Sequence, residues 1–219
     1  MTSLRLVVAV LSVFAASVAV QAQDGLTDVY SVLFVKALPG QTAAVTKTLL
    51  EQDPKDPMAA HFVLLRHQEG DDWDYVKIQH VGKQATVTVT PPPPANAAPT
   101  QAWHTDAFVA GPSWGEFSKI IAGPPTSVFI VSVHRQAPGK RAELLKLLST
   151  PDSSAKIPVS QTTMAHLEGG PWTFLQLVRY NSWQDLAADR SGAAAGTGWA
   201  DIRQHTAYHV DTIADRVAQ

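Results

Sequence analysis

Hydrophobic and polar positions follow one another in the same order twice along this chain. In the first half, a run of β-branched and aromatic residues ends at Leu38-Pro39-Gly40, which predicts a strand and then a turn. Apolar residues at helical spacing follow and predict an amphipathic helix. Two more apolar runs flank a polar stretch and predict a β-hairpin, and a closing strand follows a helix that ends near His104. The expected segments are strand 29–37, helix 42–50, strands 61–67 and 73–81, and strand 106–110.

The second half repeats this order at an almost constant offset. Pro138-Gly139 follows Pro39-Gly40 by 99 positions, and the same offset relates the two predicted hairpins. The segment Ala207-Tyr208-His209 follows Ala102-Trp103-His104 by 105 positions, so the second half has a net gain of six residues. We therefore interpret the chain as two copies of one unit of about a hundred residues. The matching segments are strand 128–136, helix 141–148, strands 162–166 and 172–180, a helix that ends near His209, and strand 211–217.

The order within each unit is β-α-β-β-α-β. This is the order of the ferredoxin-like split βαβ, a four-stranded antiparallel sheet with both helices on one face. The other face of such a sheet is bare, and packing the two bare faces on each other would close a barrel within one chain. The expected fold class is therefore α+β, with two tandem ferredoxin-like βαββαβ units packed sheet to sheet as an intramolecular α+β barrel.

The N-terminal residues indicate export. One basic residue, Arg5, precedes an apolar run of 15 residues, and Val20-Gln21-Ala22 has small residues where a signal peptidase cleaves. A membrane anchor is the alternative, but this run is shorter than the roughly 20 residues that span a bilayer. We expect an exported protein, periplasmic or extracellular, without a membrane segment after cleavage. The predicted domains are a signal peptide at 1–22, a first repeat at 27–111, a linker with a short helix at 112–125, and a second repeat at 126–219.

Composition excludes several classes of function. The chain has 17 Lys+Arg against 19 Asp+Glu, so it lacks the basic excess of nucleic-acid-binding proteins. It has no cysteine, which excludes disulfides, a thiol nucleophile, Cys-ligated zinc, iron–sulfur clusters and haem–thiolate sites. It also has no Gly-rich phosphate loop, no GxSxG elbow and no HExxH motif.

The topology brings the hairpin and the corner before the last strand to the same end of each unit. Convergence of polar groups at one end of a small sheet is typical of a functional site. The second and fourth strands are opposite edges, roughly 15 Å apart, so a pairing of His67 with His104 would need long side chains or a partner from the other copy. The residues at this end are His67, Glu69, His104 and Asp106 in the first unit and His134, His166, Glu168, His209 and Asp211 in the second.

The strand that ends in Pro-Gly, the amphipathic helix, the hairpin with His and Trp, and the closing His-x-Asp segment resemble the dimeric α+β barrel superfamily in tandem-repeat form. This resemblance covers almost all of the chain after residue 22. The superfamily includes antibiotic-biosynthesis monooxygenases, the EthD, muconolactone isomerase and NIPSNAP families, and haem proteins of the chlorite dismutase and dye-decolourising peroxidase kind. It implies the fold but no single activity, and it leaves the cofactor unknown.

Two kinds of chemistry follow from the polar end. Histidine and carboxylate groups are ligands for zinc, manganese or non-haem iron, and a histidine beside an acid is a reasonable general base near neutral pH. The alternative is that each histidine caps a carbonyl or pairs with a nearby acid, because His-x-Glu and His-x-Asp lack a third ligand at diagnostic spacing. The candidate catalytic residues are His67, His104, His166 and His209, and the metal candidates beside them are Glu69, Asp106, Glu168 and Asp211.

The third kind of site is a ligand cavity. Alternation along segment 73–81 separates an aromatic and polar face from an apolar face that contains Val76 and Ile78. We expect the apolar face against the helices and the aromatic face inside the barrel, where it would bind a small molecule. The alternative is that these rings only fill the interface between the sheets. The candidate ligand-binding residues are Tyr30, Phe34, Trp73, Tyr75, Lys77, Trp172, Phe174 and Gln176.

The hypothesis from sequence is an exported protein with a small-molecule-binding cavity between two ferredoxin-like sheets. Its expected partner is a small molecule rather than nucleic acid or membrane, and it would be a monomer or a homodimer. One alternative is a cofactor-independent or metal-assisted monooxygenase or isomerase that uses the histidines and acidic residues above. The other is a structural or protein-interaction module, whose barrel would be filled by its own side chains.

Overall fold

The computed structural model describes residues 25–52, 55, 59–83, 100–150, 157, 159–193 and 198–219. The predicted signal peptide at 1–22 lies outside these residues, as does most of the segment expected to form the second helix of the first unit. Among the helices in these ranges, none is both long enough and apolar enough to cross a bilayer.

The helices and strands follow the predicted order closely. The first half contains β1 (Asp28–Ala37), α1 (Thr42–Leu50), β2 (Phe62–Glu69), β3 (Tyr75–Lys83) and β4 (Gln101–Gly111). The connecting helix is α2 (Trp114–Ile121). The second half contains β5 (Val128–Gln136), α3 (Arg141–Ser149), β6 (Ser160–Glu168), β7 (Phe174–Tyr180), α4 (Trp183–Ala193), α5 (Gly198–His205) and β8 (Thr206–Ala218). The described elements of the first half lie within 27–111, α2 lies within 112–125, and the described elements of the second half lie within 126–219.

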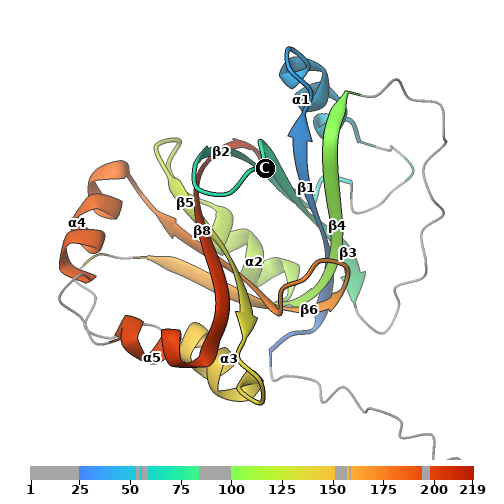
Figure 1. The fold of residues 1–219 in the computed structure, drawn as a ribbon. Coiled ribbons are helices and arrows are strands. Elements are labelled where there is room, and N and C mark those ends of the chain that lie inside the picture. The colour runs from blue at the N-terminus through green and yellow to red at the C-terminus, as the bar shows by residue number, and fades with distance from the viewer. Residues whose placement is uncertain are drawn as a thin grey trace, which may run out of the picture.

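The strands form one closed antiparallel barrel in the order β1-β3-β2-β8-β5-β7-β6-β4 (Figure 1). Each half has its fourth strand beside its first, followed by its third and its second. The halves join by their edges, because β2 pairs with β8 and β4 pairs with β6. We expected a barrel within the chain that forms when the faces of two sheets pack together. In the structure the edge strands of the two halves also pair with each other, and this pairing closes the barrel. Closure of this kind leaves no unpaired sheet edge.

The strand register agrees with the repeat proposed from the sequence. Val35 of β1 pairs with His104 of β4, and His134 of β5 pairs with His209 of β8. These positions differ by the same offsets of 99 and 105 that relate the two halves in sequence. The register therefore supports the proposal of a tandem duplication.

The barrel interior is apolar, and α2 closes one end of it. Figure 1 shows α2 within the outline of the strands, while the other helices lie outside. Phe117 and Ile121 of α2 are fully buried in the interior cluster, and Arg216 of β8 donates hydrogen bonds to the carbonyls of Ile121 and Gly123. The strand residues of this cluster include Tyr30, Val32, Phe34, Val63, Leu65, Val76, Ile78, Val109, Phe129, Val131, Met164, Leu175 and Leu177.

The prediction that helices end near His104 and His209 is wrong. Strand β4 begins at Gln101 and β8 begins at Thr206, so both histidines lie within strands, and α5 ends at His205. The reason is long-range pairing. Residues before the predicted strands form ladder hydrogen bonds with the ends of β1 and β5, which outweighs the local helical pattern.

The prediction of which face of β3 and β7 looks inward is also wrong. Val76 and Ile78 lie in the interior, whereas Tyr75 packs against Val45 and Leu49 of α1. The strand begins only at Tyr75, so the alternation does not extend back to Trp73. A closed interior has no solvent on any side, and unpaired polar groups placed there would carry a large desolvation cost.

Polar residues of this outer face instead hold the ends of the helices. The Lys77 ammonium donates to the Leu49 carbonyl at 2.8 Å, and the Gln176 amide donates to the Leu148 carbonyl at 2.9 Å. These carbonyls lie in the last turns of α1 and α3, where backbone acceptors have no partner within the helix. Phe174 likewise packs outside, in a cluster with residues of α3. Tyr75, Lys77, Phe174 and Gln176 therefore support the helices and do not face the interior.

Candidate functional site

An open pocket of about 130 Å³ lies at the end of the barrel opposite α2. It is found where β1 and β5 end, whereas α2 contacts residues near the start of β1. We call it the mouth pocket. Its lining residues are Phe34, Asp71, Trp73, Trp103, Thr105, Val133, Pro171, Trp172 and Tyr208.

Both halves of the chain supply the same positions to this pocket. Offsets of 99 relate Phe34 to Val133 and Trp73 to Trp172, and the offset of 105 relates Trp103 to Tyr208. Six of the nine lining residues are thus three equivalent pairs. The pocket lies where the two halves meet, and its aromatic character does not depend on one half alone.

Trp73 and Trp172 form the inner walls of the pocket. They are only 2% and 7% exposed, because each follows a hairpin that folds over the barrel end. A histidine ring packs against each indole at an interplanar angle of 59°: His67 against Trp73 at 5.6 Å and His166 against Trp172 at 5.0 Å between ring centroids. These two histidines support the tryptophans and do not line the pocket.

The hairpins have room for this arrangement because of glycine. Gly70 and Gly169 have positive φ, and a Cβ at Gly70 would lie 2.6 Å from the Asp211 carbonyl oxygen of β8. A Cβ at Gly169 would collide in the same way with the Asp106 carbonyl oxygen of β4. Each hairpin therefore lies directly against the last strand of the other half, which only glycine allows.

Trp103 and Tyr208 form the rim. They are 37% and 45% exposed, and each lies opposite a basic residue on the neighbouring strand. Lys36, opposite Trp103, makes ion pairs of 2.9 Å with Asp72 and 3.1 Å with Asp74. The hydrogen bonds that the Lys36 ammonium donates to Asp72 and Asp74 raise the pKa of Lys36. The hydrogen bond from Lys36 also lowers the pKa of Asp72.

Asp71 is the only one of the nine lining residues whose side chain is of a type charged at neutral pH. Its carboxylate accepts a hydrogen bond of 2.8 Å from the Asp72 amide, and its own amide donates to the Thr212 hydroxyl at 3.2 Å. The hairpin backbone therefore fixes the orientation of the carboxylate of this lining residue.

Three of the eight predicted ligand-binding residues line the pocket: Phe34, Trp73 and Trp172. Tyr30 faces the interior as expected but lies beside α2, where its hydroxyl donates to the Pro112 carbonyl at 2.8 Å and burial raises its pKa. The other four lie on the outer face described above. The prediction did not include Trp103 or Tyr208, although their match in the repeat marks them as equivalent positions.

The four candidate catalytic histidines lie in separate surroundings. His104 is exposed on the outer face of β4, 3.4 Å from Asp106. His209 stacks on His134 on the outer face, with ring centroids 5.9 Å apart. His67 and His166 pack on different tryptophans, and burial, with Arg141, lowers the pKa of His166.

The acidic residues proposed beside these histidines do not complete a metal site. Asp211 accepts hydrogen bonds from Ser132 and Arg190, and Glu69 and Glu168 are exposed on the hairpins. In the ranges that the structure describes, no three His, Asp or Glu side chains are grouped as metal ligands. The predicted residues thus provide no common centre for metal or acid–base chemistry.

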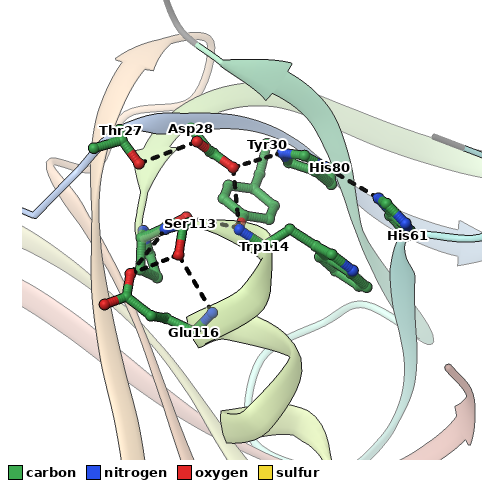
Figure 2. A network of polar contacts seen from close by, with 9 residues as sticks. Thr27, Asp28, Tyr30, His61, His80, Ser113, Trp114 and Glu116 are labelled. Carbon is green, nitrogen blue, oxygen red and sulfur yellow. Dashed lines mark hydrogen bonds and ion pairs between the residues drawn. The ribbon is translucent and has the colours of Figure 1, made fainter. Parts of the chain in front are cut away.

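A polar network that sequence reasoning missed lies at the other end of the barrel, beside α2 (Figure 2). The carboxylate of Asp28 accepts hydrogen bonds from His80 Nε2 at 2.8 Å and from the Trp114 amide at 3.0 Å. His80 Nδ1 in turn lies 3.3 Å from His61 Nδ1, and the His61 ring stacks on Trp114. Thr27 donates to the second carboxylate oxygen at 3.0 Å.

This network holds the N-terminal end of α2, and the second half holds its C-terminal end. Arg179, which follows His80 by 99 positions, donates to the Ile120 carbonyl at 2.8 Å. A carboxylate at the start of a helix and a guanidinium at its end both complement the helix dipole. The network therefore anchors the helix that closes the barrel. Asp28, His61 and His80 are separated in sequence and share no motif, so no local signal pointed to them.

Comparisons with known proteins give the chain no family. No protein-family model matches it, and no curated protein matches it. Among solved structures, it is similar to the crystal structure of a protein named "Putative Chlorite dismutase TA0507", with 10% sequence identity and a TM-score of 0.48. The likeness covers 87% of this chain and 96% of that one. Similarity at this level transfers no activity and no cofactor to the chain.

Proposed function

We propose that the protein binds a small organic molecule in the mouth pocket. The observation that carries this proposal is an open pocket lined by five aromatic residues, four of which form two equivalent pairs from the two halves. Ligand sites are typically apolar and aromatic with a few placed polar groups, and here Asp71 and Thr105 are such groups.

The size of the pocket limits the ligand. An apolar cavity of about 150 Å³ holds a benzene molecule, so a pocket of about 130 Å³ accommodates a single ring or a compact group of similar size. The remaining interior is filled by the apolar cluster of the barrel. The site proposed here is therefore at the barrel end and not in a cavity between the two sheets.

The proposal is tested by titrating phenol and indole into ¹⁵N-labelled protein and following the indole N–H signals. We expect shifts of Trp73, Trp103 and Trp172, while Trp114 beside α2 and Trp183 on α4 stay unchanged. Each of the latter two serves as an internal control, because neither lines the pocket.

A pocket-filling variant sharpens this test. Val133→Phe places at position 133 the residue found at the equivalent position 34, so it should fill the pocket without disturbing the fold. The matched control is Val217→Phe, at an exposed position of β8. Loss of the shifts in Val133→Phe alone supports the proposal. Absence of shifts with either probe at millimolar concentration, or shifts that survive Val133→Phe, would refute it.

We also propose that the chain is exported and cleaved after Ala22. The basic residue, the apolar run and the small residues before the cleavage point support this proposal. Expression in a bacterial host with mass spectrometry of the periplasmic fraction tests it. A mature protein that begins at Gln23 is expected, and an intact chain confined to the cytoplasm would contradict it.

A further inference from the structure

We propose that the mouth pocket selects a small quaternary ammonium cation, such as the trimethylammonium group of choline. This inference rests on the proposed function, because it names the ligand class of the same site.

The first observation is the set of rings. Five of the nine lining residues are aromatic, and the rings of Phe34 and Trp73 meet at 58° with centroids 5.6 Å apart. Rings at such an angle form adjoining walls and not a stack. A cation within about 6 Å of an aromatic face is attracted by the negative ring quadrupole, and aromatic cages of this kind recognise quaternary ammonium groups.

The second observation is the charge. None of the nine described lining residues is lysine or arginine, and Asp71 is the only acidic residue among them. Near the rim, Lys36 is paired with Asp72 and Asp74, and the Arg135 guanidinium lies over the Tyr208 ring at 5.5 Å. These five charged groups, three acidic and two basic, together carry one net negative charge. A monovalent cation matches this balance, whereas an anion would face Asp71 at close range.

The third observation separates a quaternary from a primary ammonium group. A primary ammonium carries three N–H donors that need acceptors when water is removed. Six of the nine lining side chains carry no hydrogen-bond acceptor, and the remaining three are Asp71, Thr105 and Tyr208. A quaternary ammonium has no N–H group to satisfy, and its methyl groups contact the rings directly.

The experiment compares choline with its neutral carbon isostere, 3,3-dimethylbutan-1-ol, by the same indole N–H titration on the intact protein. We expect choline to bind about tenfold more tightly than the isostere, because the two differ only in charge. Asp71→Asn should remove most of this preference and leave the affinity for the isostere unchanged. Asp106→Asn is the matched control, since it makes the same change in net charge on the outer face of β4.

A second variant keeps the proposal testable if Asp71→Asn disturbs the hairpin. Tyr208→Leu removes one ring of the rim without changing the charge, and it should weaken the binding of choline more than the binding of the isostere. Equal binding of choline and the isostere, or binding of phenol and indole without binding of choline, overturns the cation inference and leaves the proposed function in place. Failure of every probe to bind overturns both.

Discussion

His134 makes the stability of this protein sensitive to acid. It lies on the helix side of β5, at the position equivalent to Val35 of the first half. It is only 1% exposed, so its ring is shielded from water. Burial lowers the pKa of His134 to about 4, while Asp211 and a hydrogen bond with Gln176 partly oppose this shift and His209 adds to it. The folded protein therefore holds this side chain neutral in a range where an unfolded histidine is charged.

The size and sign of the effect follow from the two pKa values. Between pH 6.5 and about 4, the unfolded chain binds a proton at His134 that the folded chain does not bind. The free energy of unfolding must therefore fall as the pH falls through this window. The contribution of His134 is about 1.4 kcal/mol at pH 5.5 and approaches about 3 kcal/mol below pH 4.

The measurement is urea unfolding at pH 7.5 and pH 5.5 for the wild type and His134→Val. Valine is the residue at the equivalent position, so the variant should pack without a cavity. Between pH 7.5 and pH 5.5, we expect the free energy of unfolding of His134→Val to fall by about 1.4 kcal/mol less than that of the wild type. The control is His104→Val, an exposed histidine on β4, which should keep the wild-type dependence. The same loss in His134→Val and the wild type would refute the reasoning.

Two further substitutions test how the barrel is closed. Asp28→Ala should cost about 3–5 kcal/mol in urea unfolding, because it leaves the buried His80 Nε2 and the Trp114 amide without their acceptor. Gly169→Ala should lower the melting temperature strongly and expose the amides of β4 to hydrogen exchange, because the new methyl group would collide with the Asp106 carbonyl.

Each of these has a control. Thr27→Ala removes one hydrogen bond to Asp28 and should cost about 1 kcal/mol, so an equal effect of both variants would argue against a central role for the carboxylate. Gly139 has a positive φ similar to that of Gly169, but there is open space around the methyl group that Gly139→Ala would add. This variant should show the backbone cost alone, about 1–2 kcal/mol. A Gly169→Ala protein no less stable than Gly139→Ala would contradict the close approach of hairpin and strand.

The sequence alone determined the order of the elements and most of their bounds. The helix predicted at 42–50 is α1 to the residue, and the strands before Pro39-Gly40 and Pro138-Gly139 end within one residue of the prediction. The reason is local: turns at Pro-Gly and the spacing of apolar residues depend on near neighbours in the chain. The constant offset between the halves also identified Trp73 and Trp172 as equivalent, and both line the pocket.

The tertiary structure alone decided which face of each strand is the interior. Alternation separated Val76 and Ile78 from Tyr75 correctly, but it does not say which of the two faces meets the interior of the closed barrel. It also decided the site. Trp103 and Tyr208 reach the pocket only because β4 and β8 extend beyond their predicted starts to pair with β1 and β5. Asp28, His61 and His80 meet because β1 pairs with β3 and the His80 amide donates to the His61 carbonyl, and α2 brings the Trp114 amide to Asp28. These contacts join residues that are distant in the chain, and their energies depend on closure of the whole barrel, which no local pattern records.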